Sequence, residues 1–269
     1  LASGGSDNAV KLWDAKTLKE IFVLKGHAST VVSAAFGADS KSLASGSFDG
    51  IIKIWDIATG RETLSMKHTF FLKTLAFSPD GKWLASAGSN SEIKIWDATT
   101  GKQVFSLPGH ALGVNSVAFA ADGKRLASGG NDKLIRIWDL STGREIASLS
   151  CTGPVESVTF SPDGSRLASA NFLAGVSVWD ITTGNELLLL KGHKLVVDSV
   201  AFSPNGKRLA TGGYDEWVKV WDATTGKEQL TLKWHTGVSH RAIFSPDGKR
   251  LAIPSYRHSV KVWDLPNSQ

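Results

Sequence analysis

A Trp-Asp pair recurs along the whole chain at a nearly constant interval. Successive copies are 41 or 42 residues apart. Self-similarity at a fixed period of about 40 residues is typical of architectures in which each repeat is one supersecondary unit that must stack on its neighbours to bury a core. The period therefore predicts a repeat architecture. It does not indicate which partner the protein binds. The seven tryptophans are Trp13, Trp55, Trp96, Trp138, Trp179, Trp221 and Trp263.

Each copy consists of short apolar runs separated by turn sequences. The stretch from Gly192 to Asp222 opens with Gly-His, closes with Trp-Asp and contains two apolar runs around a Pro-Asn-Gly turn. Pro presets the first position of a β-turn, and Gly takes a positive φ where the turn needs one. No segment has apolar residues at the 3.6-residue period of a helix. We therefore predict an all-β chain.

The run that ends in each Trp-Asp carries apolar residues on both of its faces. In Ile52-Lys-Ile-Trp55, the two isoleucines point one way, while Lys53 and Trp55 point the other way. A strand of this kind must be covered on both sides. Neighbouring sheets arranged around a ring would provide that cover and leave only short protected edges.

The combined signature resembles the WD-repeat family of β-propellers. The copies run from Leu1 to Asp264, and each contains variants of four short motifs in the same order: Gly-His, Ser-Pro-Asp-Gly, Leu-Ala-Ser-Gly and Trp-Asp. The resemblance implies a seven-bladed β-propeller whose blades are four-stranded antiparallel sheets around a central channel. We expect residues 1–269 to form a single propeller domain.

The apolar runs number three in the first unit, four in each of the next five and three in the last. The first blade would then lack its innermost strand, and the last blade its outer strand. WD-repeat rings commonly close by pairing an N-terminal strand with the last blade, which would place both strands before Leu1. We therefore expect the chain to be part of a longer one that extends N-terminal of residue 1.

Composition narrows the classes of function. The single cysteine, Cys151, rules out a disulfide framework and fits a reducing compartment, so we expect a cytoplasmic location. Neither a signal peptide nor a membrane-spanning run is encoded.

The net charge of +5 comes from basic residues that recur once per repeat. Charge spread in this way argues against a nucleic-acid partner.

Three copies contain His, Ser or Thr, and Asp in an order that invites comparison with a hydrolase triad. A catalytic triad occurs once, whereas this set recurs in register with the tryptophans. The family resemblance implies a buried hydrogen-bond chain from Asp through His and Ser or Thr to the indole, each link being worth about 0.5–1.5 kcal/mol. We expect no catalysis. The network residues are His27, Ser45, Asp49, Trp55, His110, Ser128, Asp132, Trp138, His193, Thr211, Asp215 and Trp221.

Two copies depart from this set in a consistent way. In the third copy, Asn90 replaces the Asp beside His68 and could still accept a hydrogen bond. In the fifth copy, Thr152-Gly153 is predicted at the His position and Leu173 at the Asp position. Losing both groups together avoids leaving one buried polar group without a partner.

The seventh copy and the remaining histidines offer no site for a metal. This copy keeps His235 but has Ile253 and Arg257 in place of Ser and Asp. The repeat histidines lie one per blade, too far apart to share an ion. His240 and His258 lack a nearby cysteine or ligand-type spacing. We expect no metal and no cofactor.

The residue before the turn Asp is the main candidate for a binding surface, because it should project from the face that carries the Gly-His turns. Exposed aromatic residues with Arg and His nearby are typical of interaction hot spots. A second candidate is the run from Phe70 to Lys73. In the alternative interpretation, Trp217 and Trp234 only fill space left by the degenerate seventh copy. The predicted protein-binding residues are Phe48, Phe71, Lys73, Phe172, Tyr214, Trp217, Trp234, His240, Tyr256 and Arg257.

The sequence thus favours a non-catalytic protein-interaction scaffold or sensor domain, with a protein or peptide partner on that face. One alternative is a regulatory propeller fused to a catalytic domain, such as a kinase, protease or NTPase, outside this chain. Another is a small ligand in the channel, which would show as saturable calorimetric binding.

The hydrogen-bond network makes a testable prediction in the fourth and fifth copies. Asp132→Ala should clearly lower the melting temperature, because it removes one end of a buried polar chain. Leu173→Ala should barely change it, because the fifth copy has no such chain. Thermal unfolding of both variants checks this, and equal effects would contradict the network.

Overall fold

The computed structural model describes residues 1–172, 175–233, 241–255 and 259–266. In this part of the chain there are 26 β-strands and no helix, and the strands form seven antiparallel sheets. Five sheets have four strands, and the first and last have three. The fold is an all-β, seven-bladed β-propeller, so the fold class and the strand counts predicted from the sequence are confirmed.

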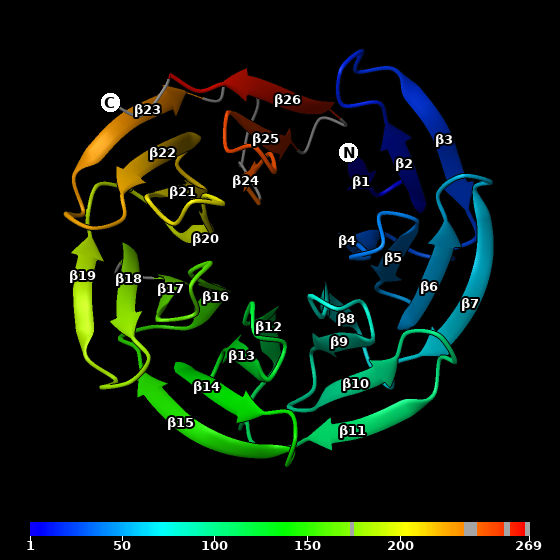
Figure 1. Cartoon of the computed structure of the whole chain (residues 1–269), viewed down its shortest axis with the longest axis horizontal. Coiled ribbons are helices and arrows are strands. Elements are labelled where there is room, and N and C mark those ends of the chain that lie inside the picture. The colour runs from blue at the N-terminus through cyan, green and yellow to red at the C-terminus, as the bar shows by residue number, and fades with distance from the viewer. Residues whose placement is uncertain (173–174, 234–240, 256–258, 267–269) are drawn as a thin grey trace. The chain divides into compact units, whose positions relative to one another are not determined.

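Within every sheet the strands follow chain order, as Figure 1 shows. The three-stranded sheets are β1 (Ala2–Gly4), β2 (Ala9–Trp13) and β3 (Glu20–Lys25), and β24 (Ile243–Phe244), β25 (Arg250–Ser255) and β26 (Ser259–Asp264). The second and third sheets are β4 (Val31–Phe36), β5 (Ser42–Ser47), β6 (Ile51–Asp56) and β7 (Arg61–Lys67), and β8 (Leu72–Phe77), β9 (Trp83–Gly88), β10 (Ile93–Asp97) and β11 (Gln103–Leu107).

The other three sheets repeat this plan. The fourth and fifth are β12 (Val114–Phe119), β13 (Arg125–Gly130), β14 (Leu134–Asp139) and β15 (Arg144–Ser150), and β16 (Val155–Phe160), β17 (Arg166–Asn171), β18 (Gly175–Asp180) and β19 (Glu186–Leu190). The sixth is β20 (Val197–Phe202), β21 (Arg208–Gly213), β22 (Trp217–Asp222) and β23 (Glu228–Lys233).

Contacts divide the chain into two compact units. The first comprises Leu1–Phe119, Gly123–Leu126 and Trp138–Glu145. The second comprises Ala120–Asp122, Ala127–Ile137 and Ile146–Gln269. That residues 1–269 act as one domain stays a prediction.

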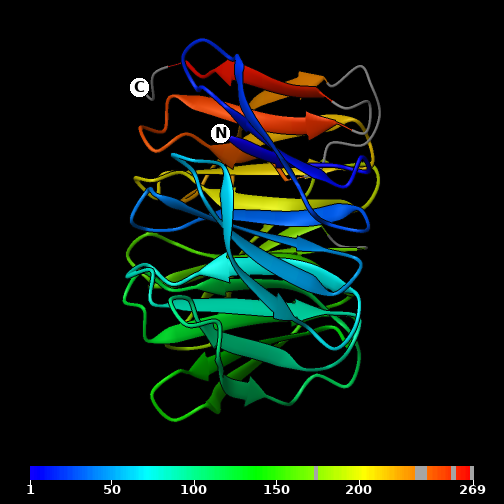
Figure 2. The same ribbon diagram turned by 90° about the vertical axis from the view of Figure 1, so that its right-hand side faces the viewer.

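In the first unit, β6 buries both of its faces, as its sequence predicts. Trp55, which is 2% exposed, packs with Val10 and other residues of the first sheet. Ile52 and Ile54 lie on the opposite face and pack with Leu72 of the third sheet. Figure 2 views this unit from the side that carries β3 and β7. The third strand of a sheet therefore joins the sheets before and after it.

The second unit repeats this packing around β22. Trp221 belongs to a cluster with Val176 and Val178 of the fifth sheet. Val218 and Val220, on the other face, pack with Leu251 of the seventh sheet. Alternating side chains of one strand thus serve two neighbouring cores.

In the second to sixth copies, the turn after the Trp-Asp also contacts the preceding sheet. Gly226, at φ +71°, is in the left-handed region that glycine adopts without strain. A Cβ there would lie only 3.0 Å from Leu190 in the fourth strand of the fifth sheet. The Asp before this turn caps it: the backbone N–H and the hydroxyl of Thr225 both donate to Asp222 Oδ1, at 2.7 and 2.9 Å.

The turn between the first and second strands is closed by a Ser and an Asp. In the fifth sheet, Ser161 Oγ donates to Asp163 Oδ1, as does the backbone N–H of Ser165 at 3.1 Å. These bonds, that from Ser161 above all, lower the pKa of Asp163 from 3.8 to about 2. In the sixth sheet Asn205 takes the same place and accepts from Ser203 at 2.7 Å, without a titrating group.

This pair of turns predicts a difference in acid stability. A carboxylate whose folded pKa is depressed stabilises the fold above its unfolded pKa, and this contribution is lost as pH falls toward the folded pKa. Asn205→Asp should therefore steepen the loss of stability between about pH 4 and 2, and Asp163→Asn should flatten it. Urea unfolding from pH 2 to 7 measures both. If the free energy of unfolding falls equally between pH 4 and 2 in the two variants and the parent, Asp163 does not have the lowered pKa described above.

Candidate functional site

The sixth sheet contains the whole chain of bonds from the turn Asp to the tryptophan. Nδ1 of His193 lies 3.0 Å from both carboxylate oxygens of Asp215, and Nε2 lies 2.7 Å from Thr211 Oγ1. The indole N–H of Trp221 donates to the same Thr211 oxygen at 2.8 Å. A carboxylate only accepts hydrogen bonds, so the imidazole proton lies on Nδ1, facing Asp215, and Nε2 accepts the Thr211 hydroxyl proton. Four side chains from two loops and two strands are thereby fixed together.

The second sheet keeps most of this arrangement. Nε2 of His27 lies 2.7 Å from Ser45 Oγ, and the Trp55 indole donates to Ser45 Oγ at 2.8 Å. Asp49 Oδ2, however, lies 3.8 Å from His27 Nδ1, too far for a hydrogen bond, and accepts the backbone N–H of Ala28 at 2.9 Å instead. Burial lowers the pKa of His27, so its ring is neutral near pH 7.

In the fifth sheet the structure corrects the sequence-based alignment. Cys151, and not Thr152-Gly153, takes the place of the histidine. Its backbone N–H donates to Lys133 O at 2.9 Å, as that of His68 donates to Gly50 O in the third copy. The Cys151 thiol reaches Ser169, whose Oγ accepts the Trp179 indole N–H at 2.9 Å. Burial raises the pKa of this thiol to about 12.

The third sheet keeps only the bond to the tryptophan. Trp96 donates to Ser86 Oγ at 2.7 Å. Asn90 does not replace the carboxylate as expected: its Oδ1 is buried and accepts no hydrogen bond from the described residues. His68 is 1% exposed, and burial, together with the positive charge of Lys94, lowers its pKa. A neutral imidazole is therefore buried there as well.

The seventh sheet shows what happens when the hydroxyl is absent. Ile253, fully buried, stands where the other sheets have Ser or Thr. The indole Nε1 of Trp263 is buried and has no hydrogen-bond partner among the described residues. Leu173, Arg257 and His235 of the degenerate copies lie outside those residues.

The fourth copy contributes buried side chains to the same positions. His110 is 4%, Ser128 0% and Trp138 2% exposed. Asp132 accepts the backbone N–H of Leu134 at 3.3 Å and lies 3.9 Å from the guanidinium of Arg136. The hydrogen-bond chain predicted for this copy stays a prediction.

The burial of the hydroxyl groups decides what this arrangement does chemically. Ser45 and Thr211 are 0% exposed, so no substrate can reach their oxygens. A nucleophile needs access to its substrate as well as a neighbouring base. The bonds therefore hold turns and strands together, which is the structural role expected from the repeats.

In the second copy, which lies in the first unit, the position before the turn Asp carries an exposed aromatic side chain. Phe48 is 42% and Phe71 64% exposed, and their rings meet edge to face with centroids 6.3 Å apart. Phe70, next to them in the chain, is 55% exposed. The backbone N–H of Phe48 donates to Thr30 O at 3.0 Å, and Phe71 O accepts the backbone N–H of Ser89 at 2.9 Å. We call Phe48, Phe70 and Phe71 the phenylalanine cluster.

In the second unit, the same position carries Phe172 and Tyr214, each 44% exposed. Their backbone N–H groups donate to Pro154 O and Val196 O, both at 2.9 Å, so the loops before β16 and β20 hold them. Trp217 is half-buried, with Lys233 Nζ 5.7 Å from its ring centroid.

Other residues of the predicted surface have different environments. Lys73 is half-buried, and its ammonium donates to Asn115 Oδ1 at 2.7 Å. Leu72, in the same run, is fully buried and opens β8. Trp234, His240, Tyr256 and Arg257 were also predicted to bind a partner, and they lie outside the described residues.

Comparison with family models gives a direct match. The model of the WD40 family, described as WD domain, G-beta repeat, matches residues 18–56, 61–97, 101–139, 143–180, 184–222 and 226–264. These segments cover most of the chain. The chain belongs to the WD40 family. Each match starts near the last strand of one sheet and ends at the Trp-Asp of the next. No curated protein matches the chain.

WD40 propellers in general bind other proteins and act as non-catalytic scaffolds. In the described part of this WD40 chain, no group of three or more His, Cys, Asp or Glu residues could hold a metal ion. Nor do those residues contain a helix able to cross a membrane.

A second row of exposed apolar residues lies on the WD40 loops, of which sequence reasoning named Phe70 but missed Leu112 and Leu195. Phe70, Leu112 and Leu195 each stand two positions after the repeat His and are 55%, 54% and 60% exposed. Their common offset from the His is a signal in the sequence that could have revealed them.

The buried indole of Trp263 predicts the effect of restoring a hydroxyl. Ile253→Thr would place an oxygen where Thr211 binds Trp221, whereas Ile253→Val has the same shape without that oxygen. We expect the Thr variant to be more stable than the Val variant by about 1 kcal/mol in urea unfolding.

Thr211→Val is the matched control in an intact sheet. It removes the acceptor of Trp221 and a partner of His193, so it should cost about 1–3 kcal/mol. If the Val variant at 253 is as stable as the Thr variant, the indole gains nothing from the hydroxyl.

Proposed function

We propose that this WD40 chain is a protein-interaction module that binds its partner through the aromatic side chains of its loops. The observation that supports this most is the phenylalanine cluster of the first unit. Three phenylalanines that are each more than two-fifths exposed stand together on loops fixed by backbone bonds. Soluble proteins seldom leave large aromatic side chains grouped in water unless they contact a partner.

The loop backbone supports a role in binding because it holds the rings in place. Gly50, at φ +76°, lies so close to Phe70 that a Cβ would sit 3.1 Å from Phe70 O. Together with the bonds of Phe48 and Phe71, this contact fixes both loops. Little conformational entropy is then lost when the rings enter a partner's pocket.

The second unit offers a separate surface of the same kind. Phe172, Tyr214 and Leu195 stand on its loops, each at least 44% exposed. Tyrosine and phenylalanine supply large contact area with few rotatable bonds. We propose that this surface contacts a protein too, with Trp217 at its margin.

Affinity capture from the source lysate tests the proposal. Phe48→Ala combined with Phe71→Ala should abolish capture of a partner that the parent chain retains, because the two side chains would form the centre of the contact. Tyr214→Ala with Trp217→Ala examines the second unit in the same way. All variants are first shown by melting to be folded.

Ile21→Ala is the matched control, since Ile21 is 54% exposed on β3, away from these loops. It should leave capture unchanged. Identical partners for the parent and both loop variants would contradict the proposed surfaces.

A further inference from the structure

The third copy buries an imidazole ring without a polar partner. Both ring nitrogens of His68 are buried and have no hydrogen-bond partner among the described residues. Asn90 stands where the sixth copy has its turn Asp, and its buried Oδ1 accepts no bond from those residues either. In the sixth copy, by contrast, His193 Nδ1 lies 3.0 Å from the carboxylate of Asp215. A proton added to His193 would face a carboxylate, whereas one added to His68 would face an amide.

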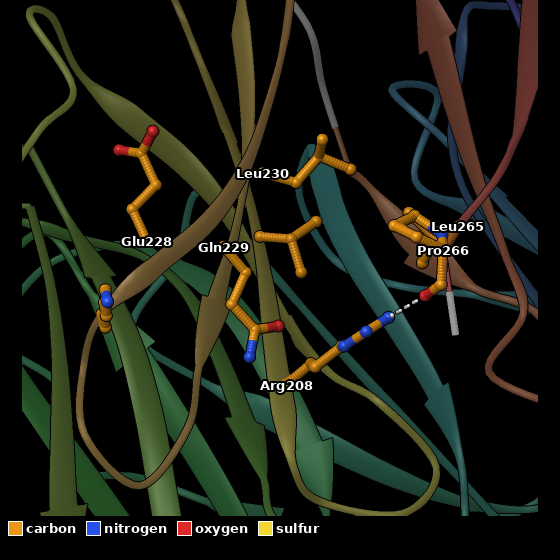
Figure 3. A pocket seen from close by; sticks show the side chains of 8 residues that line it. Arg208, Glu228, Gln229, Leu230, Leu265 and Pro266 are labelled. Atoms are coloured by element: carbon orange, nitrogen blue, oxygen red, sulfur yellow. Dashed lines mark hydrogen bonds between the residues drawn. The ribbon is translucent and has the colours of Figure 1, made fainter. Parts of the chain in front are cut away.

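Not every buried nitrogen of this kind can respond to pH. Nε of Arg208 is also buried without an acceptor among the described residues, and its Nη1 donates to Pro266 O at 3.0 Å. Figure 3 shows this side chain reaching across a cavity whose apolar walls include Leu230 and Leu265. A guanidinium keeps its proton wherever proteins are folded, whereas an imidazole gains one near pH 6.5. Of these two side chains, only that of His68 can change its charge.

The surroundings of His68 oppose a positive charge on the ring. Burial lowers its pKa most, and the ammonium of Lys94 on β10 lowers it further. Glu92 and two nearby backbone carbonyl groups act in the opposite direction with smaller effect. The Lys94 ammonium is fixed there, because it donates to Thr69 Oγ1 at 2.6 Å and lies 3.9 Å from Glu92. The folded loop therefore accepts the neutral ring and disfavours the protonated one.

The loop that follows His68 carries two members of the phenylalanine cluster. Backbone bonds close it at both ends, because His68 N–H donates to Gly50 O at 2.7 Å and Phe71 O accepts Ser89 N–H at 2.9 Å. The edge-to-face contact between Phe71 and Phe48 is made from this closed loop. Breaking the two backbone bonds would let the ring of His68 reach water and would move Phe71 away from Phe48.

Proton binding and loop opening are therefore linked. In water the imidazole has its ordinary pKa of 6.5, and in the closed loop its pKa is lower. The closed loop is accordingly favoured in full above pH 6.5 and loses stability as the pH falls below that value. Each further pH unit raises the ratio of open to closed loops by up to about tenfold, until the lowered pKa is reached.

His27 belongs to the same surface, and its environment is different. Burial lowers its pKa too, and the charge of Asp49 counteracts this in part. Nε2 of His27 keeps Ser45 Oγ at 2.7 Å, and Asp49 Oδ2 lies 3.8 Å from Nδ1. A proton added to Nδ1 would thus have a carboxylate nearby. The third copy has no such group, so its loop should respond more strongly to acid.

We propose that His68 makes binding at the phenylalanine cluster sensitive to pH: protonation of its ring opens residues 68–71, withdraws Phe70 and Phe71, and releases the protein partner. The inference rests on the binding function proposed above and specifies how that site is regulated. Binding is strongest at neutral pH and weakens toward pH 5.

Amide hydrogen exchange, corrected for the intrinsic rate at each pH, tests the opening without any partner. Protection of Ser89 N–H, which is bonded to Phe71 O, should fall by about tenfold between pH 7 and 5. Tyr214 N–H, bonded to Val196 O in the copy that has Asp215, is the internal control. Its protection should stay nearly constant over the same range.

Two variants separate the charge of His68 from other effects of acid. His68→Gln has no titrating ring, so protection of Ser89 should no longer depend on pH. Asn90→Asp gives the ring a carboxylate, as Asp215 does for His193, and should keep the loop closed at pH 5. An undiminished fall in either variant would overturn the proposal. Constant protection of Ser89 in the parent, or equal falls at Ser89 and Tyr214, would overturn it as well.

The captured partner provides a second readout. After capture at pH 7.5 in the assay described above, a wash at pH 5.5 and equal ionic strength should release the partner from the parent chain and not from Asn90→Asp. Equal retention by both would show that the opening does not reach the binding surface, which contradicts the proposed regulation. If the parent captures nothing at pH 7.5, the proposed binding function fails, whereas hydrogen exchange at Ser89 still decides whether the loop responds to acid.

Discussion

In five of the seven sheets, the fold depends on a tryptophan whose indole N–H donates to a hydroxyl group of the neighbouring strand. Trp55 lies between two sheets at 2% exposure, and its indole N–H finds Ser45 Oγ on the neighbouring strand. The bond connects strands two and three of the sheet at a fixed register, with Leu43 opposite Trp55. Burial of apolar area drives the sheets together, and it favours one register because a one-residue slip would exchange the two faces of the strand. The cost of leaving an indole N–H unpaired adds to this preference.

Most of the fold could be predicted because its determinants are local and repeat. The period, the turn residues and the two-sided apolar third strand each recur, so the copies support one another in predicting the same structure. The fifth copy shows the limit. The Cys151 side chain is smaller than an imidazole and has one polar atom where histidine has two, and its backbone bond to Lys133 O and its thiol beside Ser169 reveal the equivalence. Asn90 shows another limit, since a residue type able to accept a bond here accepts none from the described residues.

The candidate surface could be predicted in position but not in detail. Phe48, Phe172 and Tyr214 are exposed, as expected for the place before the turn Asp. Lys73 was also predicted from the sequence to bind a partner, but its ammonium donates to Asn115 on another sheet. The two residues are 42 positions apart in the chain. Pairings of this kind depend on how neighbouring sheets pack, and no local pattern encodes them.

Backbone bonds explain how one scaffold can carry many different surfaces. The residue before the turn donates its N–H to the loop ahead of the first strand in Phe48, Ser89, Phe172 and Tyr214 alike, at 2.9 to 3.0 Å. This bond involves no side-chain atom. Any residue type with a backbone N–H can therefore make it at that position. A small polar residue would satisfy the scaffold there equally well, as Ser89 shows. This backbone bond therefore does not explain the aromatic residues at that position, and the contact with another protein proposed above would explain them.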